Sequence, residues 1–505
     1  MPDSAAIVSP EVEFPDSPAG PTVGRGLLHG TLVYGATNFG LKGINFGLVV
    51  LYTRFLTPAD FGTVALAEVI AAIVAAVSSL GLTAAIQPLY FSYVSERTTL
   101  HRCISTLLRF GAAATMFFLI ISLLGGMLLA PSTGFRVAFF PYIAMALCTA
   151  AALQLVDYRL VLYQSEEKPV SYSMLAAACF LFTAGATVYR VILLRGGAVG
   201  LLGGKLTGAM LTLSLAVWLG RRWLNGGWQK SFVREALPMS LPLVPHLLLA
   251  LGLVAADRLI LQRYRSMQEV GLYSLSYTLG MVMFLVTASV AQAWSPVFYR
   301  MASQGDAKRE MIGRILSAII LLLAGIAILG STVAEPFVRL VLDPRYSTTG
   351  RLVPWIIGGY LFHALFSIFQ YSALHARKAQ FIWVISGIAC AANVGLNLAW
   401  VPRHGMYGAA YATFLAYAAE AVLMYLYAQR VFRLPIQAWR SLVALGTFVG
   451  LLAVTQASWR VLPRTGVTVL TCLVFWLLII RAGLVNFDLL KSYLKAPSAS
   501  IAEGN

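Results

Sequence analysis

The chain contains about fourteen runs of predominantly apolar residues, each long enough to cross a lipid bilayer as a helix. A hydrocarbon core about 30 Å thick needs about 20 helical residues per crossing. Only 11% of the residues are charged, against about 25% in an average soluble domain. The sequence therefore predicts an all-α polytopic membrane protein. The expected crossings are residues 27–53, 61–87, 103–130, 137–157, 170–194, 198–220, 238–262, 270–297, 311–334, 352–374, 379–401, 405–429, 440–459 and 465–482.

Two sequence patterns recur at nearly the same spacing, which indicates an internal duplication. Residues 54–62 return 209 positions later as residues 263–271, both times between apolar runs and with an acidic residue two positions before the glycine. One arginine and two glycines recur with an offset of 208, as Arg195, Gly197, Gly200 and Arg403, Gly405, Gly408. A period near two hundred residues is typical of one half of a two-lobed transporter. Six crossings separate equivalent positions, so the two halves enter the membrane in the same sense, as a parallel repeat.

The repeat and the loop charges predict how the chain is divided and oriented. Lys and Arg are more frequent in the even-numbered loops, so the positive-inside rule places both termini in the cytosol. The polar connection between the halves is interpreted either as a hinge or as an amphipathic loop on the membrane surface. The expected parts are a disordered tail (1–24), an N lobe (25–220), a linker (221–237), a C lobe (238–431), two appended helices (432–482) and a cytosolic tail (483–505).

Six charged residues fall inside predicted crossings, where a charge costs at least about 2.5 to 3.5 kcal/mol near the bilayer centre. Each is expected to face a partner or a water-filled cavity. Three of them are cations and three are acids. They are Lys42, Lys205 and Arg258, and Glu68, Asp257 and Glu420.

Some of these charges have simpler explanations. Glu68 could form a purely structural ion pair with Lys42 or Lys205. Arg258 could extend to the membrane–water interface at the helix end. The lysines do not recur in the repeat, because Lys42 corresponds to Ala250 or Leu251 and Lys205 to Thr413 or Phe414. Lobes that differ in this way would present different groups to one asymmetric ligand.

Other signals are weak or negative. His246, His363 and His375 are interpreted as packing or hydrogen-bonding residues, and the five cysteines as small packing residues without metal-ligand spacing. No nucleotide-binding, zinc or hydrolase motif is present, so neither a cofactor nor a metal is expected. The net charge of +17 lies in the loops, which favours membrane orientation over a nucleic-acid partner. Transport is therefore preferred over catalysis.

Several segments together resemble Wzx-type polysaccharide flippases, which belong to the multidrug/oligosaccharidyl-lipid/polysaccharide exporter superfamily. The likeness spans about residues 27 to 482, nearly the whole chain. The segments that carry it are residues 51–62 (LYTRFLTPADFG), 257–261 (DRLIL), 269–274 (EVGLYS), 293–299 (AWSPVFY) and 405–413 (GMYGAAYAT).

The resemblance implies a V-shaped, two-lobed bundle in the bacterial cytoplasmic (inner) membrane that opens alternately to each side. Its substrate would be an undecaprenyl-diphosphate-linked oligosaccharide, moved from the cytosolic to the periplasmic leaflet for cell-surface polysaccharide biosynthesis. Lys42, Lys205 and Arg258 would then hold the diphosphate. The partners implied are the lipid bilayer, a polysaccharide polymerase and glycosyltransferases.

Three alternatives remain open. A cation-coupled multidrug antiporter of the same superfamily would use the acids Glu68, Asp257 and Glu420. A lipid II flippase is suggested by Lys42, which lies near a functional arginine of those proteins, but Leu48 stands where they carry a second arginine. A membrane glycan enzyme ranks last, because no external loop is long enough to hold a catalytic domain.

Overall fold

The computed structural model describes residues 40–129, 136–304, 308–378 and 380–456, together with positions 37, 134, 466 and 473. Every regular element in these ranges is a helix, as the sequence predicts. Eleven of the described helices are long and apolar enough to span a membrane, and two shorter apolar helices cover Gly40–Tyr52 and Ser441–Ala453. The predicted crossing at 465–482 lies almost wholly outside the described residues.

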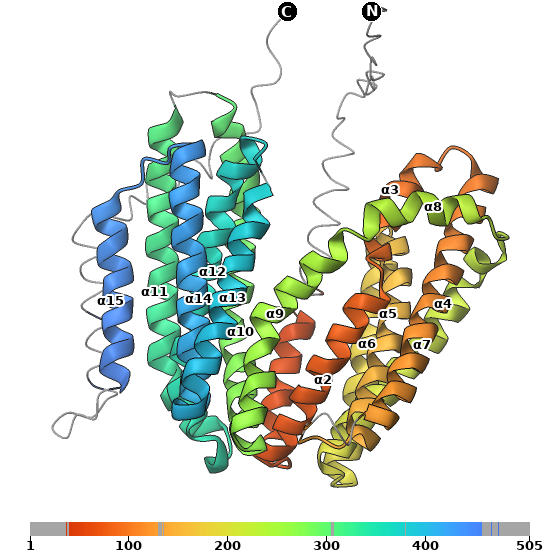
Figure 1. The fold of residues 1–505 in the computed structure, drawn as a ribbon, viewed down its shortest axis with the longest axis horizontal. Helices are drawn as coiled ribbons and strands as arrows, with labels where there is room; N and C mark the ends of the chain where they lie inside the picture. Colours follow the sequence, from red (N-terminus) through yellow and green to blue (C-terminus); the bar gives the residue numbers. More distant parts are fainter. Residues whose placement is uncertain are drawn as a thin grey trace, which may run out of the picture.

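The helices form two groups that converge at one end and diverge at the other, so that the ribbon is V-shaped (Figure 1). The N bundle comprises α2 (Pro58–Ser78), α3 (Leu82–Ser92), α4 (Arg97–Leu129), α5 (Ala144–Ser165), α6 (Pro169–Val188), α7 (Gly197–Gly220) and α8 (Lys230–Ser240). The C bundle comprises α9 (Leu243–Tyr264), α10 (Met267–Ala302), α11 (Arg309–Val341), α12 (Thr349–His375), α13 (Gln380–His404), α14 (Met406–Val431) and α15 (Ala438–Gln456).

Equivalent helices have similar lengths, which confirms the parallel repeat. The span Pro58–Ser92 has 35 residues and its counterpart Met267–Ala302 has 36, while α4 and α11 have 33 each. The two bundles differ in one respect that the sequence analysis missed. The first of these spans is interrupted by a turn at Leu80 and Gly81, which gives α2 and α3, whereas α10 is continuous.

The repeated segments begin equivalent helices with the same local chemistry. Thr57 caps α2 by accepting a hydrogen bond from the Asp60 amide, and Ser266 caps α10 by accepting from the Glu269 amide. The acidic side chains then reach a second helix. Asp60 accepts from the Ala198 amide at the start of α7 (3.3 Å), and Glu269 accepts from the Met406 amide at the start of α14 (3.1 Å). A carboxylate at a helix N-terminus is stabilised by the helix dipole.

The two bundles meet through the repeated glycines at the converging end. A β-carbon on Gly62 would overlap the Met267 carbonyl, and one on Gly271 would overlap the Pro58 carbonyl. Only glycine permits backbones to approach this closely. The α2 and α10 backbones are therefore in direct contact across the molecule.

A loop of the C bundle closes over the same end. Tyr346, in the 3₁₀ turn Pro344–Tyr346, donates a hydrogen bond to the Leu56 carbonyl (2.8 Å), and its ring packs edge-on against Phe61. The Arg345 guanidinium is held by Asp343 (2.8 Å) and lies 3.4 Å from the Thr53 carbonyl. These contacts reinforce the junction that the glycines form.

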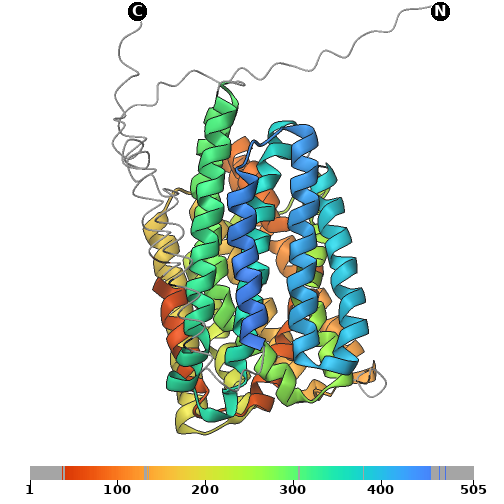
Figure 2. The ribbon, with the colours of Figure 1, turned by 90° about the vertical axis from the view of Figure 1, so that its left-hand side faces the viewer.

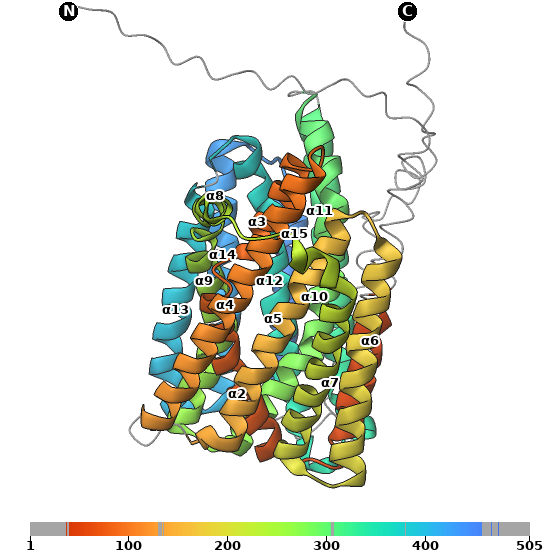
Figure 3. The ribbon, with the colours of Figure 1, turned by 90° about the vertical axis from the view of Figure 1, so that its right-hand side faces the viewer.

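The polar connection predicted at residues 221–237 is an ordered part of the N bundle. It forms a 3₁₀ turn (Arg221–Asn225) and α8, and it buries Trp223, Phe232 and Ala236 in a cluster with residues of α3, α4 and α5. Ser105 of α4 also donates to the Leu224 carbonyl (3.1 Å). Figure 1 shows α8 lying across the end of the N bundle, and Figure 3 shows it end-on near the same end.

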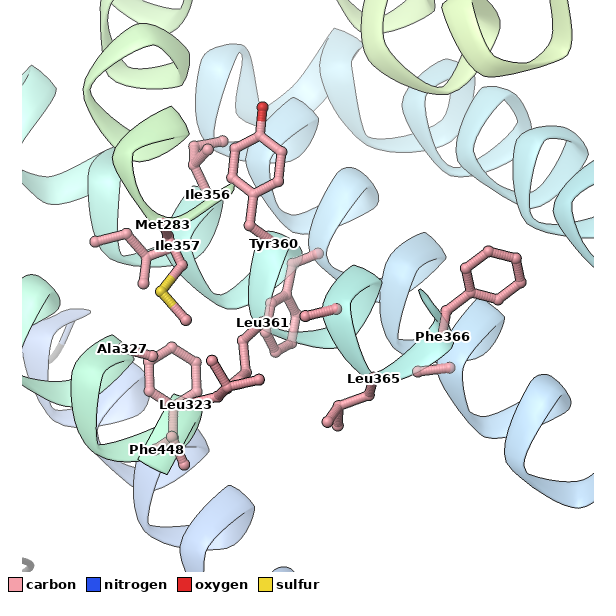
Figure 4. Close-up of a cluster of buried hydrophobic side chains, with 14 of the residues drawn as sticks. Met283, Leu323, Ala327, Ile356, Ile357, Tyr360, Leu361, Leu365, Phe366 and Phe448 are labelled. Carbon is pink, nitrogen blue, oxygen red and sulfur yellow. The ribbon is translucent and has the colours of Figure 1, made fainter. Parts of the chain in front are cut away.

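The C bundle has the larger continuous apolar core. Figure 4 shows part of it, where Leu323 and Ala327 of α11, Leu361 of α12 and Phe448 of α15 lie together. The last described helix, α15, packs on the outer side of the bundle beside α11 (Figure 2). It corresponds to the predicted crossing at 440–459 and extends the C bundle beyond the repeat.

Candidate functional site

The helix Gly40–Tyr52 contacts both bundles and carries Lys42. Its Leu48 packs on the core of the N bundle, whereas Phe46 packs on the C bundle with its ring centroid 5.9 Å from that of Phe337 in α11. The Lys42 side chain is exposed and makes no hydrogen bond or ion pair with any described residue. Lys42 and Phe46 are four positions apart, on one face of the helix. This places an unpaired cation one turn from an apolar contact between the bundles.

Glu68 of α2 and Lys205 of α7 form an ion pair inside the N bundle. Their side chains are 44% and 33% exposed, so the pair is open to its surroundings rather than sealed in the core. Gly204 and Gly208 pack closely on Thr187 and Thr183 of α6, and Lys205 extends instead towards α2. Of the two partners considered for Glu68, the structure selects Lys205.

Asp257 and Arg258 lie in the interior of the C bundle, 0% and 8% exposed. Asp257 accepts hydrogen bonds from the Tyr273 hydroxyl and, at 3.5 Å, from Thr413. Arg258 donates to Ser274 (3.1 Å) and to the Val254 carbonyl (2.6 Å). Burial of a charge is tolerated only when it is paired and hydrogen-bonded, as both groups are here.

This arrangement decides between the two explanations of Arg258. The guanidinium does not extend to a helix end but lies 4.6 Å from the ring centroid of Tyr277, a cation–π geometry. Two of its nitrogens donate to protein groups and the residue is buried, so little of it is available to a diphosphate in this conformation. The network continues to Asn393 of α13, which donates to Thr413 (3.3 Å).

Glu420 of α14 lies in a second polar cluster of the C bundle, on the wall of a cavity of ≈ 400 Å³. Its carboxylate accepts from the Ser386 hydroxyl (2.8 Å) and lies 3.2 Å from Nδ1 of His363. Helices α9, α10, α12, α13 and α14 all contribute to the wall. The sequence predicted a packing or hydrogen-bonding role for His363, and the position of its ring nitrogen beside Glu420 fits the second of these roles.

The six predicted residues thus occupy four places. Glu68 and Lys205 are together, Asp257 and Arg258 are together, and Lys42 and Glu420 each lie apart. The residues that complete these clusters were missed because their partners are more than thirty positions away in the sequence or lie on other helices. They are His363, Tyr273, Ser386, Asn393 and Thr413.

Outside the predicted crossings, Glu166 forms the centre of an ionic cluster on the N bundle. It accepts from Lys168 (2.7 Å), Trp223 (2.8 Å), Arg222 (3.1 Å) and Arg159 (3.2 Å). Burial opposes ionisation of this carboxyl, but the hydrogen bonds and positive charges dominate and lower its pKa to about 2. The cluster joins the turn between α5 and α6 to the connection between the bundles.

The fold and the intramembrane charges define a multi-pass membrane protein built from two helical bundles. The family profile of polysaccharide biosynthesis proteins matches residues 51–349. The match covers more than half of the chain, which therefore belongs to this family. No curated protein matches the sequence.

Solved transporters share the fold. A lipid II flippase, MurJ, in an inward closed conformation is 11% identical, with a TM-score of 0.60, over 88% of this chain and 100% of that one. An inward-facing MATE family multidrug resistance transporter of the MOP superfamily is 11% identical, with a TM-score of 0.57, over 79% and 94%. A mutant of the Vibrio cholerae MATE transporter VcmN is 12% identical, with a TM-score of 0.52, over 82% and 97%. The fold of the multidrug/oligosaccharidyl-lipid/polysaccharide exporter superfamily is thereby confirmed.

Proposed function

We propose that this protein is a flippase that moves an undecaprenyl-diphosphate-linked oligosaccharide from the cytosolic to the periplasmic leaflet of the bacterial inner membrane. The observation that carries the proposal is Lys42, an exposed cation that has no partner among the described residues and lies on an apolar helix that contacts both bundles. An intramembrane cation without a protein partner is costly unless it meets water or an anion. A diphosphate supplies that anion. Membership of the polysaccharide biosynthesis family supports a saccharide as the other part of the substrate.

The shape supports alternating access. The bundles diverge on the side of α8 and are closed at the opposite end by Gly62, Gly271 and Tyr346. With α8 and both termini in the cytosol, this conformation is open to the cytosol. The moving units in this proposal are the N bundle, which includes α8, and the C bundle. Lys205 would share the headgroup with Lys42 after release from Glu68, while Arg258 would keep the C bundle rigid.

Replacement of Lys42 tests the headgroup role. In cells, Lys42→Ala is expected to cause lipid-linked oligosaccharide to accumulate on the cytosolic leaflet while the protein still inserts in the membrane. Lys42→Arg should retain part of the flux, because it keeps the charge. Lys378→Ala is the matched control, since Lys378 is also exposed but lies in the turn after α12. Normal flux in Lys42→Ala would exclude the headgroup role.

A cation-coupled multidrug antiporter is the second candidate. It is favoured by Glu420, which contacts a histidine and a serine but forms no ion pair with a lysine or arginine among the described residues, unlike Glu68 and Asp257. Deletion of the gene distinguishes the two. A flippase predicts accumulation of lipid-linked oligosaccharide, whereas an antiporter predicts unchanged lipid pools and increased drug sensitivity. The proposed partners, a polymerase and glycosyltransferases, apply only in the first case.

A further inference from the structure

The cavity beside Glu420 has the size and lining of a site for a small polar organic molecule. At ≈ 400 Å³ it falls in the range of about 300 to 1,000 Å³ typical of ligand pockets. A bound ion or proton needs far less room, since one water occupies about 30 Å³ in the liquid. The cavity therefore has room for a molecule much larger than a coupling ion.

Five aromatic rings contribute to the wall of the cavity. Phe284, Tyr360, Phe366, Trp383 and Tyr417 come from four helices and line the same cavity. Figure 4 shows the Tyr360 hydroxyl pointing away from the apolar side chains of the core. Trp383 and Met281 remain exposed and so mark the mouth. Flat rings of this kind pack against the C–H faces of a sugar ring.

The polar lining supplies both donors and acceptors. Glu420 offers carboxylate oxygens, Ser367 and Ser386 offer hydroxyls, and Gln370 offers an amide that forms no hydrogen bond with any described residue. Nε2 of His363 also has no partner among the described residues, because only Nδ1 faces Glu420. A ligand with several hydroxyls can satisfy such a mixed set, since each hydroxyl donates and accepts.

Charge separates this cavity from the proposed headgroup site. Glu420 is 1% exposed, and none of the described residues that line the cavity is a Lys or Arg. A carboxylate in such a place repels a diphosphate and any acidic sugar but accepts hydrogen bonds from hydroxyl and amino groups. The cations Lys42 and Lys205 lie on other elements. The two halves of a lipid-linked saccharide would therefore bind at different places.

We infer that the cavity between α9, α10, α12, α13 and α14 binds a neutral or amino sugar unit of the transported molecule. Glu420 and Gln370 bind its hydroxyl or amino groups, and Trp383 packs against its ring. The inference rests on the proposed function but concerns a different part of the substrate. It adds a saccharide site in the C bundle to the headgroup site around Lys42.

Binding can be measured by tryptophan fluorescence of the full-length protein in lipid nanodiscs. The probes are glucose, galactose, N-acetylglucosamine, glucosamine and glucuronate. At least one of the first four should change the fluorescence saturably, and glucuronate should bind about tenfold more weakly because Glu420 repels it. Trp383→Phe should abolish most of the change. Trp439→Phe should not, because this exposed tryptophan lies on α15, outside the cavity.

Glu420→Gln completes the design. It keeps the shape of the side chain, and it should weaken glucosamine binding about tenfold while restoring glucuronate binding. Absence of any saccharide response, tightest binding of glucuronate, or a response only to sodium or pH would each overturn the inference. If no saccharide gives a response but Lys42→Ala loses flux, the saccharide site is excluded and the flippase proposal stands. If a saccharide gives a response but Lys42→Ala keeps normal flux, the saccharide site stands and the headgroup role of Lys42 is excluded.

Discussion

The N and C bundles share a frame but differ in their polar interiors. In both, an acidic residue two positions before a glycine caps the helix that ends the repeat, Asp60 for α7 and Glu269 for α14. The ionic groups follow no such symmetry. The Glu68–Lys205 pair of the N bundle is partly exposed, whereas Asp257 and Arg258 of the C bundle are sealed in a hydrogen-bonded network.

The difference shows which features hold the architecture and which were free to diverge. Backbone contacts and helix caps depend on geometry that each half must reproduce, so they recur. Side-chain charges depend on what a cavity must bind, and they differ. The N bundle offers a partly exposed ion pair, while the C bundle offers a buried hydrogen-bonded network beside a separate polar cavity.

The largest effect is expected where the shared frame is broken. Gly271→Leu should prevent the bundles from docking, because its side chain would overlap the Pro58 carbonyl of α2 and backbone cannot be repacked like a side chain. The expected result is loss of monodisperse protein in size-exclusion chromatography. Gly395→Leu on α13 is the control, since no described atom lies within 4 Å of a β-carbon there. Equal yields of both variants would contradict the proposed close contact.

A smaller loss is expected in the interior of the C bundle. Asp257→Ala leaves Arg258 buried without its carboxylate and should lower the free energy of unfolding by about 3 to 5 kcal/mol. Thermal unfolding monitored by fluorescence measures the loss. Tyr273→Phe removes one hydrogen bond to the same carboxylate and should cost about 1 to 3 kcal/mol. A loss under 1 kcal/mol in Asp257→Ala would show that the network is not sealed.

Acid is expected to destabilise the N bundle more than the C bundle. The turn after α5 carries the Glu166 carboxyl, whereas the equivalent turn after α12 carries no carboxyl at that position. The Lys168 amide donates to the Tyr163 carbonyl and the Lys378 amide to the Ala373 carbonyl, both at 2.9 Å, but Ala376 stands in the place of Glu166. The pKa of Glu166 falls from 4.5 to about 2 on folding. Its contribution, about 3 kcal/mol, is therefore complete above pH 4.5 and is lost as the pH falls towards 2.

Glu166→Gln tests this directly. The variant should be less stable than the wild type at pH 7 and should lose less stability on acidification, as measured by the unfolding temperature from pH 7 to 3. Glu310→Gln is the control, because Glu310 is exposed and pairs with Arg314 on its own helix. An identical pH profile for the wild type and Glu166→Gln would place the acid-sensitive group elsewhere.

The smallest effect is expected for the exposed ion pair of the N bundle. A double-mutant cycle of Glu68→Ala and Lys205→Ala should give a coupling free energy below about 1 kcal/mol, because both groups are partly exposed. Transport should respond far more strongly than stability if Lys205 is released to bind substrate. A coupling free energy above 2 kcal/mol, with normal transport in the variants, would instead show that the pair only stabilises the fold.

Long apolar runs and repeated capping segments predicted the helices well, because both depend on nearby residues. The spans near 198–220 and 405–429 were found at Gly197–Gly220 and Met406–Val431. Residues 230–240 were partly assigned to a crossing but form α8 on the surface of the N bundle, since Phe232 and Ala236 find an apolar cluster there. That cluster exists only in the folded chain.

The sites were less predictable, because their residues meet through packing between distant helices. Charge inside an apolar run was enough to identify Lys42, Glu68 and Glu420 as unusual. It could not identify His363 as the neighbour of Glu420, 57 positions away, or choose between two lysines for Glu68. It also could not show that Arg258 turns inward, because helix ends and bundle interiors look alike in a linear pattern.

The glycine junction has a consequence for the origin of the chain. Gly62 meets the carbonyl of Met267 while Gly271 meets the carbonyl of Pro58, and these four residues are two equivalent pairs at an offset of 209. Such reciprocity defines an isologous interface, the kind that two copies of one subunit form about a two-fold axis. Fusion of a self-associating half-length ancestor would leave this trace, with each half free afterwards to acquire its own charges.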